Sequence, residues 1–429
     1  MFKAGFARVD VTPPFGTKIT GYFAERIADG ILDPLELNAL AVNFNEQTFV
    51  VIAADMLEIF IEDATEIRTA IAEATALPLD NIIIQALHQH TSTNPGRRKG
   101  VVGLEYQIFL TKCYCDVALA AIDDLKEATV SVAEEETKTP ISFVRRYRMK
   151  DGSAKTNPPY RDPNILEPIG TADNTVRFVK FERENAKDIA LVGFQTHPDN
   201  IGGNKFSADW PGFARRITEE TLDVNCILLN GCEGDCATAN YPNADPRETF
   251  EEKYGYVRFM GQSIADVVSK NWTNTKPVKI DRIFGDCQLT YVPGVTEGFE
   301  RIEECKELFE IISLPEYREK YTMEEKAVIR RIAGLDTTSI AHKIPVSVLT
   351  FGNISILAYG GEAFAEYAYE MRREFPDRFI LTAINANGAQ GYFPTAEAYK
   401  EGGYEASASN FRPVVKDILQ GAAKELLKK

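Results

Sequence analysis

Hydrophobic and polar positions along the chain form blocks that predict strands and helices in turn. Residues 47–54 are apolar almost throughout, which is typical of a strand buried on both faces. In residues 58–76 apolar side chains recur at spacings of three and four, which predicts an amphipathic helix. A second, mostly apolar run covers residues 81–90 and predicts another strand. This strand-helix-strand order predicts a mixed α/β fold with functional groups at the C-terminal ends of strands.

Similar blocks follow to the end of the chain. Further strands are predicted at 1–12, 35–44, 130–144, 176–181, 189–195, 226–230, 279–291, 344–350, 354–359 and 379–383. Further helices are predicted at 105–128, 207–222 and 246–271, from Glu362 to about 374, and at the C-terminus. The proline-rich residues 145–172 predict an irregular segment. The highly charged residues 297–335 predict a helical insertion over the core. No repeat or linker divides the chain, so we expect residues 1–429 to form one large catalytic domain with a mixed sheet and surrounding helices.

Composition and net charge indicate the class of protein and argue against some kinds of partner. The 429 residues are 44% hydrophobic and 26% charged, which is the profile of a soluble globular enzyme. A net charge of −15 argues against nucleic acid and anionic membranes as partners and leaves a small-molecule or lipid-like substrate. No segment has the length of a transmembrane helix or of a signal peptide. We therefore expect a cytoplasmic protein, or a secreted one if a leader has been removed.

Candidate chemistry gathers at predicted strand ends. The chain has four histidines, and His88 and His90 stand two apart, where side chains of a strand point to the same side. His197 also follows a strand. Glu362 follows two glycines at the expected start of a helix, whose positive N-terminus would keep the carboxylate ionised. Imidazole and carboxylate groups are the usual ligands of a catalytic zinc.

Each of these residues also has an ordinary structural explanation. Glu362 could cap a helix, His197 could be a packed core residue, and Tyr392 could be a core aromatic with a bonded hydroxyl. The seven cysteines are odd in number and lack paired C-x-x-C spacings, which argues against a disulfide framework or a thiolate zinc site.

An ordered series of motifs runs along nearly the whole chain. Its members are Gly5-Phe-Ala-Arg-Val-Asp-Val-Thr-Pro-Pro14, Gly21-Tyr22, Ala53-Ala-Asp55, Ala86-Leu-His-Gln-His-Thr91, Phe194-Gln-Thr-His-Pro198, Ser207-Ala-Asp-Trp-Pro-Gly212, Asn230-Gly-Cys-Glu-Gly-Asp235, Gly360-Gly-Glu362 and the loop from Asn385 to Tyr392. This series resembles the catalytic N-terminal domain of the neutral/alkaline (non-lysosomal) ceramidase family.

The resemblance implies one zinc ion per chain and a role for each matching residue. The zinc ligands would be His88, His197, Glu362 and Tyr392. His90 would correspond to the active-site histidine that is not a ligand and would serve as general acid and base. Arg146 or Arg148 would match the family's active-site arginine.

The chain departs from the family in three places. Ala237 stands where family members often have a serine, so a serine nucleophile at that position is excluded unless Thr238 has shifted into it. The motif reads His-Gln-His in place of His-Thr-His. The chain stops soon after the tyrosine motif, without the family's C-terminal β-sandwich domain, which argues against ceramide itself as the substrate.

These observations predict a zinc-dependent amidohydrolase that cleaves a linear, ceramide-like N-acyl bond. Zinc would polarise the scissile carbonyl and make water reactive near neutral pH, and His90 would carry the proton to the leaving amine. Tyr392 could also hydrogen-bond the oxyanion. The alternatives are a metal-dependent esterase, lactonase or other hydrolase of a small soluble metabolite, a non-catalytic metal-stabilised binding protein, and a protein with purely structural histidines.

Overall fold

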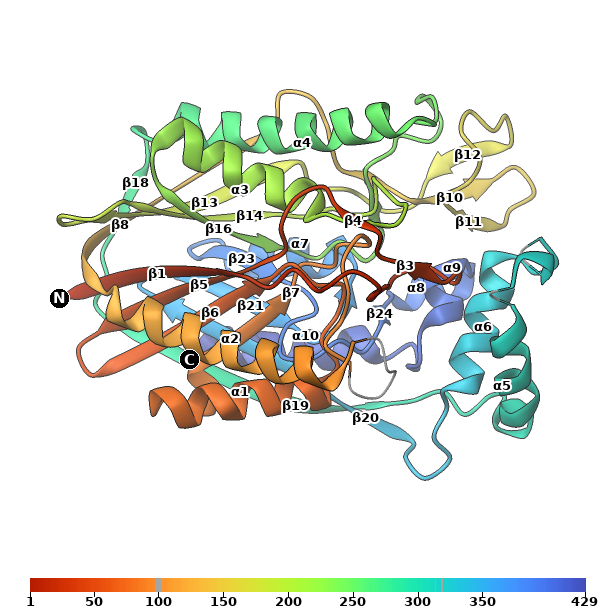
Figure 1. The fold of residues 1–429 in the computed structure, drawn as a ribbon. Coiled ribbons are helices and arrows are strands. Elements are labelled where there is room, and N and C mark those ends of the chain that lie inside the picture. Colours follow the sequence, from red (N-terminus) through yellow and green to blue (C-terminus); the bar gives the residue numbers. More distant parts are fainter. Residues whose placement is uncertain (97–101, 313, 318) are drawn as a thin grey trace.

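The computed structural model describes residues 1–96, 102–312, 314–317 and 319–429. Two mixed β-sheets pack against each other, and helices cover their outer faces (Figure 1). The larger sheet has the order β16 (Asn225–Asn230), β14 (Ile189–Phe194), β13 (Thr175–Arg183), β8 (Lys126–Glu136), β1 (Phe2–Asp10), β5 (Glu36–Phe44), β6 (Gln47–Ala54) and β7 (Ile82–Ala86), and β18 (Lys276–Val278) also pairs with β8. The smaller sheet has the order β19 (Ile283–Pro293), β20 (Ala341–Phe351), β21 (Ile354–Tyr359) and β23 (Phe379–Ala383).

Three β-α-β units supply the parallel pairs of these sheets. They are β6-α1-β7, β14-α3-β16 and β21-α7-β23, where the helices are α1 (Ile61–Thr75), α3 (Asp209–Leu222) and α7 (Ala365–Glu374). A parallel pair needs a crossover connection, and a helix supplies it in each case. The other neighbouring strands of the two sheets are antiparallel. The predicted mixed α/β fold is therefore confirmed.

Strand β6 lies between two apolar layers, and this position explains its almost continuously apolar sequence. Phe49 and Val51 contribute to the core between the two sheets, whereas Val50 and Ile52 pack toward α1 and α2 (Leu104–Asp123). Successive side chains of a strand point to opposite faces, so a strand between two apolar layers needs hydrophobic residues at every position. The predicted burial of this strand on both faces is confirmed.

Several predicted element boundaries are wrong. The strand of residues 81–90 ends at Ala86, before either histidine. The helix predicted at 105–128 ends at Asp123, because β8 begins at Lys126 and pairs with β13. The segment 145–172 contains a small sheet of β11 (Ala154–Thr156), β10 (Arg146–Met149) and β12 (Ile165–Pro168). Strands of three or four residues carry too little hydrophobic pattern to be recognised, and they are stable only through their pairing.

The remaining elements lie around the sheets. The charged segment forms η3 (Phe299–Arg301), α5 (Ile302–Ile311), η4 (Pro315–Tyr317) and α6 (Met323–Ala333), at one end of the molecule (Figure 1). Residues 313 and 318 of this segment lie outside the described residues, and its being an insertion stays a prediction. The remaining helices are α4 (Phe250–Asn271), α8 (Ala396–Glu401), α9 (Tyr404–Ala408) and α10 (Val415–Lys428). Four two-stranded sheets pair β2 (Lys18–Ile19) with β3 (Arg26–Ile27), β4 (Gly30–Ile31) with β15 (Lys205–Phe206), β9 (Phe143–Val144) with β17 (Cys236–Ala237), and β22 (Glu362–Ala363) with β24 (Tyr392–Phe393).

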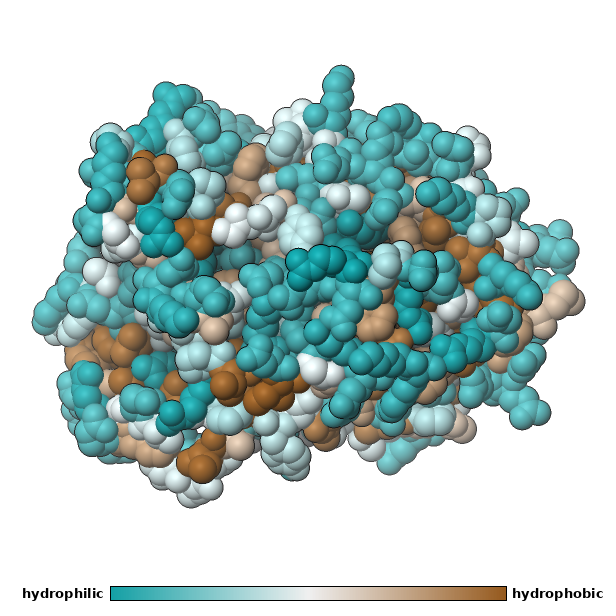
Figure 2. All heavy atoms as spheres, turned by 180° about the vertical axis from the view of Figure 1, so that it is seen from behind, coloured by the Kyte–Doolittle hydropathy of each residue, from teal (hydrophilic) through white to brown (hydrophobic). Residues whose placement is uncertain are grey.

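The surface is mostly polar. Hydrophilic residues cover most of the face shown in Figure 2, and apolar residues lie there in separate groups. In the part of the chain that the structure describes, no helix combines the length and the apolar character that crossing a bilayer requires.

Candidate metal centre

The chemically active side chains follow the C-terminal ends of the strands in the three β-α-β units. His88 follows β7, His197 follows β14 and Glu233 follows β16. In the smaller sheet Glu362 follows β21 and Asn385 follows β23. Side chains from segments far apart in the sequence therefore meet at one edge of the paired sheets, as an α/β fold predicts.

The buried side-chain amides of Gln85 and Asn230 link the ends of these strands by hydrogen bonds. Gln85 of β7 donates hydrogen bonds from Nε2 to the carbonyl oxygens of Asn230 (2.6 Å) and Ile384 (3.0 Å). Asn230 donates from Nδ2 to the carbonyl of Leu87 (3.1 Å). The ends of β7, β16 and β23 are thus held at fixed spacing, which positions the side chains that follow them.

His88 takes up an unusual backbone conformation just after β7. Its φ is +75°, in the left-handed region that non-glycine residues seldom adopt. Its backbone N–H donates to the carbonyl of Met56 (2.9 Å), and its Nδ1 lies 2.8 Å from the carbonyl of Leu57. These contacts direct Nε2 toward Glu362, whose Oε2 lies 3.4 Å away. Strain of this kind persists only where the surroundings impose it, and it concentrates at functional sites.

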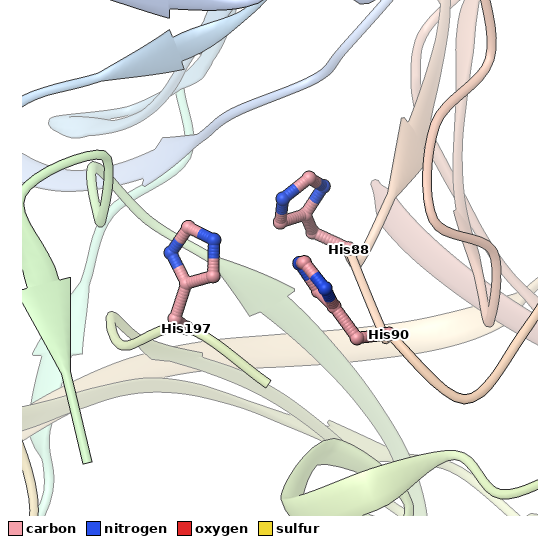
Figure 3. Close-up of side chains that lie close together, drawn as sticks. All are labelled: His88, His90 and His197. Carbon is pink, nitrogen blue, oxygen red and sulfur yellow. The ribbon is translucent and has the colours of Figure 1, made fainter. Parts of the chain in front are cut away.

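The expectation that His88 and His90 share a strand face is wrong, because neither lies in a strand. The two rings nevertheless converge with that of His197 (Figure 3). The ring centroids are 5.0 Å apart for His88 and His90, 4.9 Å for His88 and His197, and 5.4 Å for His90 and His197. Tertiary contacts, and not the pleat of a strand, bring the histidines together.

Four buried residues could hold a metal ion. Donor atoms of His88, His197, Glu233 and Glu362 lie within 4.8 Å of one another. Oε2 of Glu362 lies 3.4 Å from Nε2 of His88 and 3.8 Å from Nε2 of His197. Ligand atoms around a tetrahedral zinc, with bonds of about 2.0–2.1 Å, are separated by about 3.3 Å. The two imidazoles and the Glu362 carboxylate therefore fit a zinc ion.

Glu362 is not at a helix N-terminus as expected. It lies in β22 and pairs with Tyr392 of β24, and α7 begins only at Ala365. Burial favours the neutral carboxyl, but the charge of the neighbouring His88 outweighs it and lowers the pKa of Glu362. The short parallel pairing also places the Tyr392 backbone directly beside Glu362, which brings two of the residues expected as ligands together.

The cluster has more acceptor atoms than the surrounding protein satisfies. Within the described residues, Oε1 of Glu233 and Oε2 of Glu362 have no hydrogen bond of standard geometry, and Oε2 of Glu233 contacts Nδ1 of His197. Burial raises the pKa of Glu233 to about 8, and the charge of Glu362 adds to the effect. Burial lowers the pKa of His88, but Glu362 reverses this and raises it to about 10. Unsatisfied buried acceptors and mutually repelling carboxylates are the arrangement that a divalent cation would stabilise.

His90 lies beside the four-residue cluster, and with His88 and His197 it forms a second group of side chains that could hold a metal ion. Neither of its buried ring nitrogens has a hydrogen-bond partner among the described residues, and Nδ1 is 3.8 Å from Oδ2 of Asp199. Asp199 accepts a hydrogen bond from the hydroxyl of Tyr22, whose ring centroid is 5.6 Å from that of His90. A Cβ at Gly21 would lie 2.7 Å from Nδ1 of His90, so the close approach of this loop requires glycine. Burial lowers the pKa of His90 to about 3.

Arg145, rather than Arg146 or Arg148, reaches the cluster. Its Nη1 lies 3.3 Å from Nε2 of His197, and its guanidinium carbon is 5.2 Å from the centroid of the Tyr392 ring. Nε and Nη2 donate to Glu405 (2.7 Å) and to the carbonyl of Gly234 (2.7 Å). Arg146 instead donates to the carbonyl of Gly402 (2.8 Å), and Arg148 donates to Glu401 (2.6 Å).

Sequence reasoning therefore missed Glu233, Arg145 and Asp199. Glu233 lies in the motif Asn230–Asp235, directly after a predicted strand, and this position could have nominated it. Nothing in the sequence distinguishes Arg145 from its neighbours, because the choice depends on how β9 and β10 are paired.

The fold is similar to that of solved ceramidase structures. Neutral ceramidase from Pseudomonas aeruginosa matches with a TM-score of 0.75 and 14% sequence identity, over 99% of this chain and 74% of that chain. A ceramidase complexed with C2 matches with a TM-score of 0.74 and 13% identity, over the same shares of the two chains. The chain has the ceramidase fold. No family model matches the sequence, and no curated protein matches it. The ceramidase fold thus accounts for almost the entire chain, and the candidate metal centre lies at its strand ends.

Proposed function

We propose that the chain is a zinc-dependent hydrolase that cleaves the amide bond of a linear N-acyl substrate. The observation that carries this proposal is the buried cluster of two imidazoles and two carboxylates whose acceptor atoms exceed the donors around them. The solved structures of similar fold are ceramidases, which favours an N-acyl bond as the target.

Zinc would be held by His88, His197 and Glu362, with Tyr392 as the fourth ligand. Both Nε2 atoms face Oε2 of Glu362. The other nitrogen of each ring meets an acceptor, since Nδ1 of His88 contacts the Leu57 carbonyl and Nδ1 of His197 contacts Glu233. Zinc-binding histidines usually donate their second nitrogen in this way, which fixes the tautomer and the ring orientation. Glu233 would therefore orient His197.

The residues around the zinc would carry the proton chemistry. Bound zinc supplies Lewis acidity, which polarises the scissile carbonyl and makes water reactive near neutral pH. His90, oriented by Asp199, would take a proton from the attacking water and pass it to the leaving nitrogen. The water's OH joins the acyl carbon, the C–N bond breaks, and the hydrogen goes to the amine. Arg145 would take the active-site role expected for Arg146.

The test combines metal analysis with a matched substrate panel. We expect about one zinc per purified chain and hydrolysis of N-acyl amides that stops on chelation and returns with added zinc. Esters and lactones with the same acyl group serve as the comparison. Cleavage of esters or lactones without amides would identify an esterase or lactonase instead. Stoichiometric metal without any turnover would support a binding protein and refute the enzyme.

A further inference from the structure

Two cavities of different character lie on either side of Tyr22, near the candidate metal centre. The first, of about 300 Å³, reaches His197 and Arg145 and has polar walls that include Asn157, Asn200 and Thr238. The second, of about 250 Å³, is lined mainly by apolar side chains such as Phe23, Ile312 and Met323, and Lys326 and Tyr404 also line it. Tyr22 lines both cavities, and Gly21, which packs against His90, lines the second. A substrate whose scissile bond lies at the histidines would therefore extend into one polar and one apolar space.

The polar cavity contains two cations without a carboxylate partner. Arg247 and Lys253 line it, and neither side chain forms an ion pair with a carboxylate of the described residues. The guanidinium carbon of Arg247 lies 3.2 Å from the centroid of the Tyr256 ring. Tyr256 is itself fixed, because its hydroxyl donates to the carbonyl of Thr238 (3.0 Å). Lys253 and Tyr256 are three residues apart on α4, so they lie on one face of that helix.

The positive charge of Arg247 and Lys253 is opposite in sign to the net charge of the whole chain. The sequence has 63 acidic and 48 basic side chains, which gives a net charge of −15. The carboxylate that lines the polar cavity is Asp199, and Tyr22 already donates to it. The other basic residue of the cavity, Arg145, is paired with Glu405. Arg247 and Lys253 therefore remain available to an anionic group of a ligand.

We propose that the substrate is an N-acyl amino acid whose carboxylate binds Arg247 and Lys253. This proposal rests on the proposed function and specifies its substrate class. The apolar acyl chain occupies the second cavity, and the amide bond lies at His90 and the metal centre between the two spaces. A guanidinium and an ammonium group bind a carboxylate through charge-assisted hydrogen bonds, whereas a neutral amine half would leave both cations unpaired. Hydrolysis adds water across the C–N bond and yields a fatty acid and a free amino acid.

The experiment compares N-decanoylglycine with N-decanoylethanolamine, which is close in size and uncharged. We expect the zinc-loaded wild-type protein to prefer the anionic substrate. In the double variant Arg247→Gln/Lys253→Gln, KM for N-decanoylglycine should rise by about 10–100-fold, since each tenfold change corresponds to about 1.4 kcal/mol. Its kcat, and both constants for the uncharged amide, should change little. The control Arg258→Gln/Lys270→Gln removes the same charge from α4 outside the cavity and should leave the preference intact.

A binding measurement separates this proposal from the proposed function. In a His88→Ala background, which removes an expected zinc ligand, N-decanoylglycine should still bind by calorimetry, and the Arg247/Lys253 changes should weaken that binding by a similar factor. Anion-dependent binding without hydrolysis by the wild-type protein would refute the hydrolase and keep the anion site. Equal turnover of both amides, with equal effects of the double variant on each, would overturn the N-acyl amino acid and keep the hydrolase.

Discussion

Asp55 and Arg215 form a buried ion pair close to the candidate metal centre, and both side chains are fully buried. The Asp55 carboxylate accepts hydrogen bonds from Nη1 (2.9 Å) and Nη2 (2.5 Å) of Arg215, from Gln89 (2.7 Å) and from the backbone N–H of Glu36 (2.9 Å). Each oxygen of Asp55 thus has two donors, and its charge is paired with that of Arg215, which also contacts Glu36.

The metal centre is also deeply buried, but its carboxylates lack matching hydrogen-bond donors. Glu233 and Glu362 keep oxygens without hydrogen bonds among the described residues, and their charges repel each other. A buried charge without a partner is costly, so such a group persists where something else completes it. The comparison shows that burial and charge alone do not distinguish a functional site from a structural one. The unsatisfied carboxylate oxygens separate these two groups.

The His-Gln-His motif contributes to both groups. His88 and His90 point to the metal centre, whereas Gln89 donates to Asp55. Gln89, the middle residue of this motif, therefore anchors the segment that carries the two histidines. The Asp55–Arg215 pair anchors the backbone of this segment through Gln89, and the metal centre would supply the chemistry.

The largest effect should follow from removing an expected zinc ligand. His88→Ala should abolish both zinc binding and amide hydrolysis, because one imidazole of the cluster is lost while its carboxylates remain. Metal analysis and turnover measure the two losses. His342→Ala is the matched control, since His342 is the fourth histidine and packs on Phe411, away from the cluster. Retention of zinc by His88→Ala would contradict the ligand assignment.

His90→Ala should retain zinc and lower kcat by about 10²–10⁴-fold, the usual contribution of a general acid or base. The physical reason is that the ring nitrogens of His90 lie beside the cluster without hydrogen-bond partners among the described residues, whereas His88, His197 and Glu362 would hold the metal. Zinc content and kcat, measured on the same preparation, separate the two roles. Loss of zinc in this variant would show that His90 is a ligand.

Arg215→Met should lower the free energy of unfolding by about 3–5 kcal/mol, because Asp55 would remain buried without its cation. Chemical denaturation measures the change. Arg216→Met is the control on the same helix, since Arg216 is half-buried beside Asp33 and should cost much less. A small effect at Arg215 would show that the Asp55–Arg215 ion pair contributes little to stability and would contradict the structural role assigned to it.

Glu233→Gln should give the smallest of these effects, a weakening of zinc affinity by about 10–100-fold, as is typical of residues that orient a ligand. Competition with a zinc chelator measures the affinity, and Glu233→Asp offers a shorter carboxylate for comparison. A complete loss of zinc in the glutamine variant would instead assign Glu233 as a direct ligand.

The sequence by itself determined the mixed α/β class and most of the long elements. Residues 49–54 are apolar at every position because both faces of β6 are covered there, and α1 shows its stripe because one face is covered. The order of motifs also nominated His88, His197 and Glu362, which the structure brings into one cluster. These features could be predicted because local periodicity and residue chemistry are properties of short segments.

Only the tertiary structure decided the details of the site. The left-handed turn at His88 depends on carbonyls of Met56 and Leu57, and the choice of Arg145 depends on strand pairing. Glu233 became a candidate because β16 ends beside β7 and β23, which are more than a hundred residues away along the chain. Contacts between distant segments leave no periodic pattern in the sequence, so the partners of a side chain become visible only once the sheets have packed.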